Sequence, residues 1–265
     1  MNTKITVFVV AGLLVCLGAA VPAAQAQPPC SLNTLNGSYG FFGEATLVTE
    51  PPVVLVTTGM ITFDGAGNLT GESVSNVNGW GAGDPGTFTG YYTVNPDCTY
   101  SGMHWGPGGE EPLRFTGVIT GSGIFQETHF VVTEPGWVAL GTVKKMPPGG
   151  CSLGSLKGSY ALSGGGTITA NVPPLPYRDL GIVIYDGAGN FYGSDTAMVG
   201  GLEVADLFTG NATVTEGCAV AIEISTTAYG VLHAMGWITG EAKSQEFHFI
   251  YTDPGLLATG TLKKQ

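Results

Sequence analysis

Apolar and polar side chains alternate along much of this chain with a period of two. The alternation runs from Phe88 to Val94 and again from Phe208 to Val214, as it does on a half-buried β-strand. The 3.6-residue period of an amphipathic helix is absent from these stretches. Turn sequences such as Asp64-Gly65 and Pro135-Gly136 separate the alternating runs. The pattern predicts eight strands in the first half of the chain, near residues 38–48, 53–63, 68–77, 87–94, 98–105, 113–120, 124–133 and 137–145.

The same unit occurs twice in the sequence. The segment Cys30–Tyr39 recurs as Cys151–Tyr160 with seven of ten positions identical, and Asp64–Asn68 recurs as Asp186–Asn190. A period near 120 residues is too long for a solenoid repeat and indicates a duplicated domain. The predicted organisation is a first β-barrel repeat over residues 27–146, a Pro/Gly linker over 147–150 and a second repeat over 151–265.

The N-terminal segment has the features of an export signal. Lys4 precedes an apolar run from Ile5 to Leu17, and Ala24 and Ala26 supply the small residues of a cleavage site. The apolar run of 13 residues is shorter than the roughly 20 that a transmembrane helix needs. We therefore expect residues 1–26 to be a signal peptide and the mature chain, which has no second long apolar run, to be secreted or periplasmic without a membrane span.

Export leaves four cysteines, namely Cys30, Cys98, Cys151 and Cys218, in an oxidising compartment. Four cysteines allow three pairings, and the repeat selects Cys30–Cys98 and Cys151–Cys218. Because no two of them lie close together in the sequence, we expect disulfides rather than a metal site.

Eight short antiparallel strands in sequence order favour an all-β fold of two tandem eight-stranded up-and-down β-barrels, which leave no exposed sheet edge. A pair of β-sandwiches is the rival architecture. Glycines inside the predicted strands, such as Gly71 and Gly117, suit the sharp bends of a small barrel.

Several motifs support the barrel through a family resemblance. They are the Cys-Ser-Leu openings of both repeats, the hairpin Ile61–Asn68, the segment Asp97–Thr99 and the closing Thr-[Glu/Asp]-Pro-Gly…Gly-Thr-x-Lys. Together they resemble secreted bacterial domains related to the allene oxide cyclase barrel, a calycin-like fold. The resemblance covers both repeats and implies the barrel and an apolar lumen able to hold a small molecule. No catalytic motif of that family maps onto this sequence, so the resemblance assigns no catalytic residue.

Composition excludes several function classes. Charged residues make up 11% of the chain, against roughly 25% in average domains, and the formal net charge is −11. This acidic balance opposes binding to phosphate backbones, so no nucleic-acid partner is expected. The sequence contains no phosphate-binding loop and no Ser-His-Asp arrangement, and it predicts neither a metal nor another cofactor. The 43 glycines fall largely at turns and strand bends that both repeats share.

Candidate ligand-binding residues follow from the inward face of the strands. Alternation places Tyr39 and its counterpart Tyr160 inward, and we expect Phe88 and Phe208 to line the two lumens. His104 is the fifth candidate, because its counterpart in the second repeat, Ile224, belongs to an inward apolar row. A neutral imidazole at that position could orient a carbonyl or carboxylate. The competing interpretation, favoured by the nearby strand end, is that His104 lies in a loop.

Two Glu-x-His pairs, Glu127 with His129 and Glu246 with His248, could act as acid–base dyads or metal ligands, since residues i and i+2 share one face of a strand. Aromatic residues occupy the alternate face, so we expect both pairs to lie outside the barrels in solvent.

Asp195 falls on the inward face of the second barrel, where an unpaired carboxylate would be costly. We therefore expect a bend at Gly193 to turn it away.

These observations favour a non-enzymatic binding module whose lumens accept small apolar ligands. The alternatives are a cofactor-free cyclase or isomerase with a shaped apolar pocket, and a structural or adhesive surface protein. The sequence identifies neither the ligand nor an oligomeric state.

Overall fold

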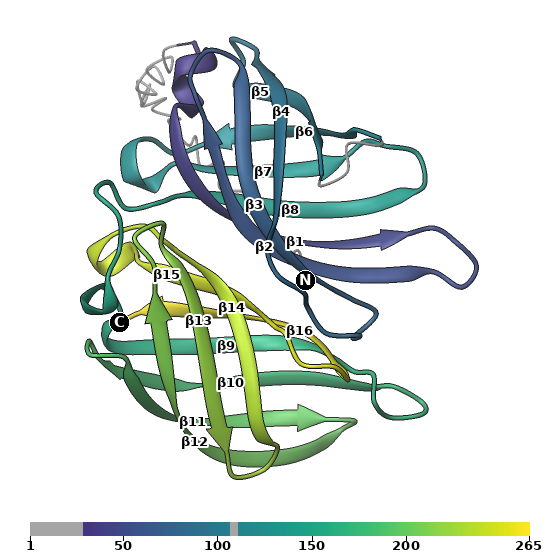
Figure 1. The fold of residues 1–265 in the computed structure, drawn as a ribbon, viewed down its shortest axis with the longest axis vertical. Coiled ribbons are helices and arrows are strands. Elements are labelled where there is room, and N and C mark those ends of the chain that lie inside the picture. Colours follow the sequence, from purple (N-terminus) through teal and green to yellow (C-terminus); the bar gives the residue numbers. More distant parts are fainter. Residues whose placement is uncertain (1–28, 107–110) are drawn as a thin grey trace, which may run out of the picture.

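The computed structural model describes residues 29–106 and 111–265 (Figure 1). These residues form two closed β-barrels, one from each half of the chain, which are drawn one above the other in Figure 1. The predicted signal peptide, residues 1–26, lies outside the described residues.

The first barrel is an eight-stranded antiparallel meander. Each strand pairs with the next, and β1 also pairs with β8, so the sheet closes. The prediction of an up-and-down barrel is confirmed, and the sandwich is excluded because the first and last strands share a ladder. The strands are β1 Gly37–Leu47, β2 Val53–Phe63, β3 Asn68–Val77, β4 Gly86–Val94, β5 Thr99–Trp105, β6 Leu113–Thr120, β7 Glu127–Val132 and β8 Trp137–Lys145.

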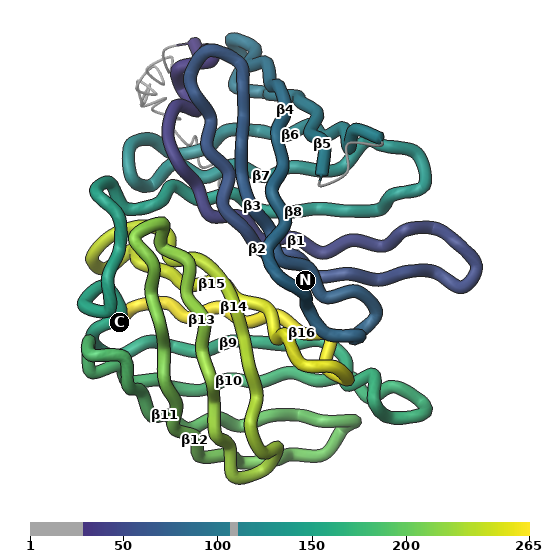
Figure 2. Tube along the Cα trace, in the orientation of Figure 1, coloured from purple at the N-terminus to yellow at the C-terminus, as the bar shows by residue number. Residues whose placement is uncertain are grey.

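The second barrel repeats this topology, with β9 paired to both β10 and β16. The trace in Figure 2 shows both halves of the chain following the same up-and-down path. The strands are β9 Lys157–Ile168, β10 Leu175–Asp186, β11 Asn190–Val199, β12 Leu202–Val214, β13 Ala219–Thr226, β14 Gly230–Thr239, β15 Glu246–Tyr251 and β16 Leu256–Lys264.

Strand β7 is shorter than the sequence pattern predicts. Residues 124–133 alternate, yet the strand begins only at Glu127 because Gly123–Phe125 forms a short 3-10 turn. Gly121 precedes this turn and Gly123 begins it, with φ values of 68° and 61°, a left-handed conformation that glycine adopts without steric cost.

Both predicted disulfides are present. Cys30 pairs with Cys98 and Cys151 with Cys218, and their Cα atoms lie 5.0 and 4.8 Å apart. Each bond ties the segment before the first strand of a barrel to the turn between its fourth and fifth strands. Two disulfides indicate an oxidising, extracytoplasmic environment. Within the described ranges, no helix has the length and apolar character needed to cross a bilayer.

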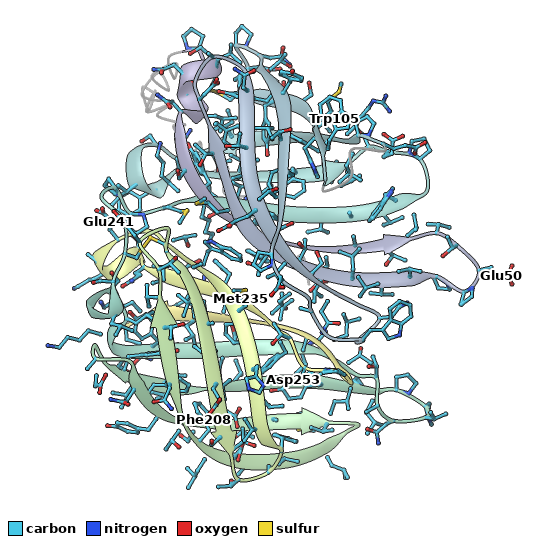
Figure 3. The ribbon with its side chains drawn as sticks, in the orientation of Figure 1. Glu50, Trp105, Phe208, Met235, Glu241 and Asp253 are labelled. Atoms are coloured by element: carbon cyan, nitrogen blue, oxygen red, sulfur yellow. A yellow bond between two sulfur atoms is a disulfide. The ribbon has the colours of Figure 1, made fainter. Side chains whose placement is uncertain are left out.

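The two barrels pack side by side through different faces. The outer surface of β14–β16 in the second barrel covers the outer surface of β1–β3 in the first. Trp237 and Ile250 are consequently 1% and 0% exposed, although both side chains point away from their own lumen. Phe42 stacks on His248 with ring centroids 4.4 Å apart. Met235, labelled in Figure 3, also lies on β14 where the barrels meet.

Candidate functional site

The lumen of the first barrel contains a cavity of about 230 Å³. Alternation along the strands aims one side of each toward this space, and all eight strands contribute to its wall. Most of the wall is aliphatic or aromatic, and its polar members are Glu44, Thr57, Ser73, Ser75 and His104, apart from the hydroxyl of Tyr100. The principal apolar contributors are Phe41, Leu55, Phe88, Leu113, Phe115, Phe130 and Val132.

His104 lies on the cavity wall. It belongs to β5, in register with Gly90 on β4 and Leu113 on β6, so the interpretation of His104 as a loop residue is wrong. Its ring centroid lies 5.0 Å from that of Phe88 and 6.3 Å from that of Phe115. The Nδ1 atom is buried and has no hydrogen-bond partner in the protein. Burial lowers the pKa of His104, so the imidazole is neutral at pH 7.

The end of the first lumen that lies away from His104 is closed. The 3-10 helix Leu32–Leu35 lies across it, and the buried Gln126 joins this helix to the barrel. Gln126 accepts a hydrogen bond from the Tyr39 hydroxyl at 2.9 Å and donates one to the Thr34 carbonyl at 2.7 Å. Burial raises the pKa of Tyr39, which keeps its hydroxyl protonated. The cavity lies toward the other end of the barrel, where Leu55 contributes to its wall.

Tyr39 and Tyr160 were predicted as ligand-binding residues, but neither lies against a lumen cavity. The Tyr160 hydroxyl donates to Gln245 Oε1 at 3.1 Å, and Gln245 donates to the Ser155 carbonyl at 2.8 Å. These bonds repeat those of Gln126, so each barrel is closed at this end by a plug made of a buried glutamine and a short 3-10 helix. Alternation predicts that a side chain points inward but does not show which end of the barrel it occupies.

The lumen of the second barrel is nearly filled. Its cavity measures about 40 Å³, and Phe208 lies on its wall. The strand pairing shows which residues of the two barrels are equivalent. Ile61 pairs with Tyr39 in the first barrel, and Val183 pairs with Tyr160 at the same place in the second. Four larger or more polar residues replace four of the first barrel: Tyr177 for Leu55, Asp179 for Thr57, Asp195 for Ser73 and Tyr251 for Val132.

Three carboxylates therefore point into the second lumen. Asp195 lies directly opposite Asp206 on the β11–β12 ladder, and Asp179 is 3% exposed. Asp206 accepts hydrogen bonds from the main-chain nitrogen and hydroxyl of Thr227 at 2.9 and 2.6 Å. Burial, aided by the charges of Asp179 and Asp206, raises the pKa of Asp195 to about 7. Burial also raises the pKa of Asp179.

The predicted bend at Gly193 is absent. Strand β11 keeps its register with β10 through Gly193, which faces Val183, and Asp195 then faces Gly181 on the lumen side. The ring of Phe208 occupies the space above Gly193, which explains the glycine without any change of direction.

The two Glu-x-His pairs differ in their surroundings. Glu127 and His129 lie outside the first barrel and are partly exposed, as predicted. Glu246 and His248 also lie outside their lumen, but the first barrel covers them, so the prediction that they face solvent is wrong. Glu246 forms an ion pair with Lys144 of the first barrel. Within the described ranges, no three His, Cys, Asp or Glu side chains are grouped to hold a metal ion.

Comparisons with known proteins add little to this geometry. No family model matches the sequence, and no curated protein matches it. Among solved structures, a candidate AttH from Nitrosomonas europaea is 8% identical, with a TM-score of 0.26 and coverage of 86% of this chain and 92% of that chain. Kievitone hydratase from Nectria haematococca is 8% identical, with a TM-score of 0.28 and coverage of 92% and 93%. Scores at this level carry no argument about function.

Proposed function

We propose that this protein binds a small apolar molecule in the lumen of its first barrel. The observation that carries the proposal is the contrast between the two lumens. The first has a cavity of about 230 Å³ with a largely apolar wall, whereas tyrosines and aspartates fill the equivalent space in the second.

The size and wall of the cavity define the ligand class. Drug-sized ligands occupy pockets of roughly 300–1,000 Å³, so a cavity of about 230 Å³ suits a smaller molecule of one or two rings or a short chain. The aromatic rings of Phe88 and Phe115 offer dispersion contacts with such a molecule. His104 adds a buried ring nitrogen without a hydrogen-bond partner, which favours a ligand with a hydroxyl group at that point.

The other predicted ligand-binding residues have no part in this site. Tyr39 closes the far end of the first barrel, Tyr160 closes that of the second, and Phe208 lies in the filled lumen. For export we propose the secretory route that residues 1–26 and the two disulfides favour.

A titration with 2-naphthol, followed by its fluorescence, tests the proposal. Wild-type protein should bind it saturably with one site per chain. The double variant Leu55→Tyr/Val132→Tyr gives the first lumen the two tyrosines of the second and should weaken binding at least tenfold. Val54→Tyr adds a tyrosine one residue away on the outer face and should bind like wild type. Saturable binding that survives the double variant would place the site elsewhere.

His104 can be tested with a pair of matched ligands. His104→Phe should weaken binding of 2-naphthol about fivefold, because a hydrogen bond is worth on the order of 1 kcal/mol, and should leave naphthalene binding unchanged. Equal losses for both ligands would mean that His104 contributes shape alone.

A cofactor-free cyclase or isomerase of the allene oxide cyclase type is the second candidate function. The neutral imidazole on an apolar wall favours it, because such a group can orient or deprotonate a reactive substrate. Compounds recovered unchanged after incubation support binding alone. Conversion of a bound compound that His104→Phe abolishes would favour the enzyme.

A further inference from the structure

The contact between the two barrels joins two unlike faces of one repeated unit. The first barrel contributes the outer surface of β1–β3, and the second contributes the outer surface of β14–β16. Each barrel also has the face that its neighbour uses. The first barrel has a β6–β8 face, equivalent to β14–β16, and the second has a β9–β11 face, equivalent to β1–β3.

The β6–β8 face presents exposed valines that the described residues leave uncovered. Val118, Val131 and Val138 are 47%, 47% and 67% exposed. Val118 and Val131 are the counterparts of Trp237 and Ile250 in the second barrel. The strand pairing shows this, because Val118 pairs with His129 and Trp237 pairs with the equivalent His248. Those counterparts are 1% and 0% exposed in the contact within the chain. The same kind of surface is thus buried in one barrel and open in the other.

The β9–β11 face also presents apolar side chains that nothing in residues 29–106 and 111–265 covers. Leu180, Ile182 and Met198 are 68%, 47% and 45% exposed. Leu180 and Met198 occupy the positions of Thr58 and Asn76, which are both 0% exposed beneath the second barrel. Contiguous exposed apolar patches on a globular protein mark interaction sites. On the β9–β11 face, Leu180 and Met198 stand where the first barrel has the hydroxyl of Thr58 and the amide of Asn76.

Two opposite charges lie on or beside the two open faces: Glu127 is on β7, and Lys263 is on β16, the strand next to β9. Within the chain, Lys144 forms ion pairs with Glu127 of its own barrel and with Glu246 of the next barrel. Its counterpart Lys263 pairs with Glu246 of its own barrel and is 61% exposed. If the same contact formed between chains, Lys263 would meet Glu127 of the following chain.

We propose that a second copy of this chain docks its β6–β8 face on the β9–β11 face, which repeats between chains the contact made within the chain. Such a contact is heterologous, since the two surfaces differ, and it leaves one open face at each end. Association therefore continues head to tail, into a ring or an open filament.

The contact between chains is weaker than the one within the chain. In the first barrel, the connection between β3 and β4 reaches the second barrel, where the Ala82 nitrogen donates to the Thr252 carbonyl and the Gly79 carbonyl accepts from Gly255. The equivalent connection between β11 and β12 consists only of Gly200 and Gly201 and is too short to do this. Self-association should therefore be reversible and depend on protein concentration.

Sedimentation velocity from micromolar to near-millimolar protein tests the proposal. Wild-type protein should shift to larger species as its concentration rises, as should Tyr91→Glu, a control on an exposed residue of β4 outside both faces. Val131→Glu and Leu180→Glu each block one face and should stay monomeric alone. Mixed in equal amounts, they should form a dimer and nothing larger, because each keeps the face that the other has lost.

Three results would overturn the proposal. Wild-type protein could remain monomeric throughout the range, either single variant could associate as wild type does, or the mixture could fail to form the dimer. All variants should first show the thermal unfolding transition of wild type. The outcome is independent of lumen binding, so failure here leaves the proposed function intact.

Discussion

At the scale of single residues, a few inward positions decide which lumen is open. Leu55 and Val132 leave space in the first barrel, and Tyr177 and Tyr251 fill the same positions in the second. The change from Ser73 to Asp195 adds a carboxyl group whose charged form is poorly solvated. The second barrel thus replaces a binding space with a polar filling that costs stability when ionised.

Asp195 should make stability depend on pH. Its pKa is about 7 when folded and about 4 when unfolded, so the folded state holds a proton that the unfolded state releases between these values. The stability that Asp195 contributes through this proton is fully present below pH 4 and is lost as the pH rises to about 7. Asp195→Ser, which installs the first-barrel residue, removes this loss.

Urea unfolding of wild type and Asp195→Ser between pH 4 and pH 8 measures the effect. The variant should gain on the order of 1 kcal/mol relative to wild type across this range, a figure reduced for solvent screening of a half-buried group. A difference between the two proteins that did not change with pH would contradict the assignment.

His104 and Asp195 show what a duplicated sequence can reveal about single residues. Comparison with Ile224 predicts the inward face for His104, and the structure shows that β5 extends far enough to include it. Alternation also predicts an inward Asp195, but the cost of burying a carboxylate favours a bend that the structure does not contain. The strand stays in register, and burial raises the pKa of the Asp195 carboxyl instead, an effect that the alternation of residues does not reveal.

At the scale of elements, inward aromatic rings lie over glycines of neighbouring strands. The Phe88 ring occupies the space where a side chain at Gly71 would lie, and the Phe41 ring does the same at Gly59. These pairs explain why glycines interrupt otherwise apolar inward rows. They also let large rings pack against the barrel wall, which leaves the centre of the first lumen free.

Gly71→Ala should therefore destabilise the first barrel, because the added methyl group would overlap both the Phe88 ring and the Met60 carbonyl. Overpacking of this kind costs about 1–3 kcal/mol. Gly83→Ala is the matched control, since no atom lies within 4 Å of a Cβ built there. Equal unfolding midpoints for the two variants in urea would refute the packing explanation.

Strand positions were predictable because period-two alternation reports the inward face directly. The predicted bounds agree with β2, β3, β6 and β8, and the cysteine pairing followed from the repeat. The plug formed by Gln126 was not predictable. Its partners lie on the Leu32–Leu35 helix and at Tyr39, far away in sequence, and no local pattern marks a glutamine as buried.

At the scale of the whole molecule, duplication predicted two barrels but neither their contact nor their unequal lumens. Alternation cannot distinguish an outer face that another barrel covers from one that faces solvent. It therefore predicts that Glu246 and His248 face solvent. The sequence does hold a signal in retrospect: Trp237 and Ile250 are larger than their counterparts Val118 and Val131. Positions at which the two repeats differ therefore indicate where the two barrels have different surroundings.

A crystal structure with a brominated naphthol, located by its anomalous scattering, tests the central claim most directly. The account predicts one bromine site per chain inside the first barrel, in contact with Phe88 and Phe115, with the hydroxyl within hydrogen-bond distance of His104. The second barrel should contain none. Bromine bound only on the barrel exteriors, or equally in both lumens, would contradict the claim that the first barrel is the binding site.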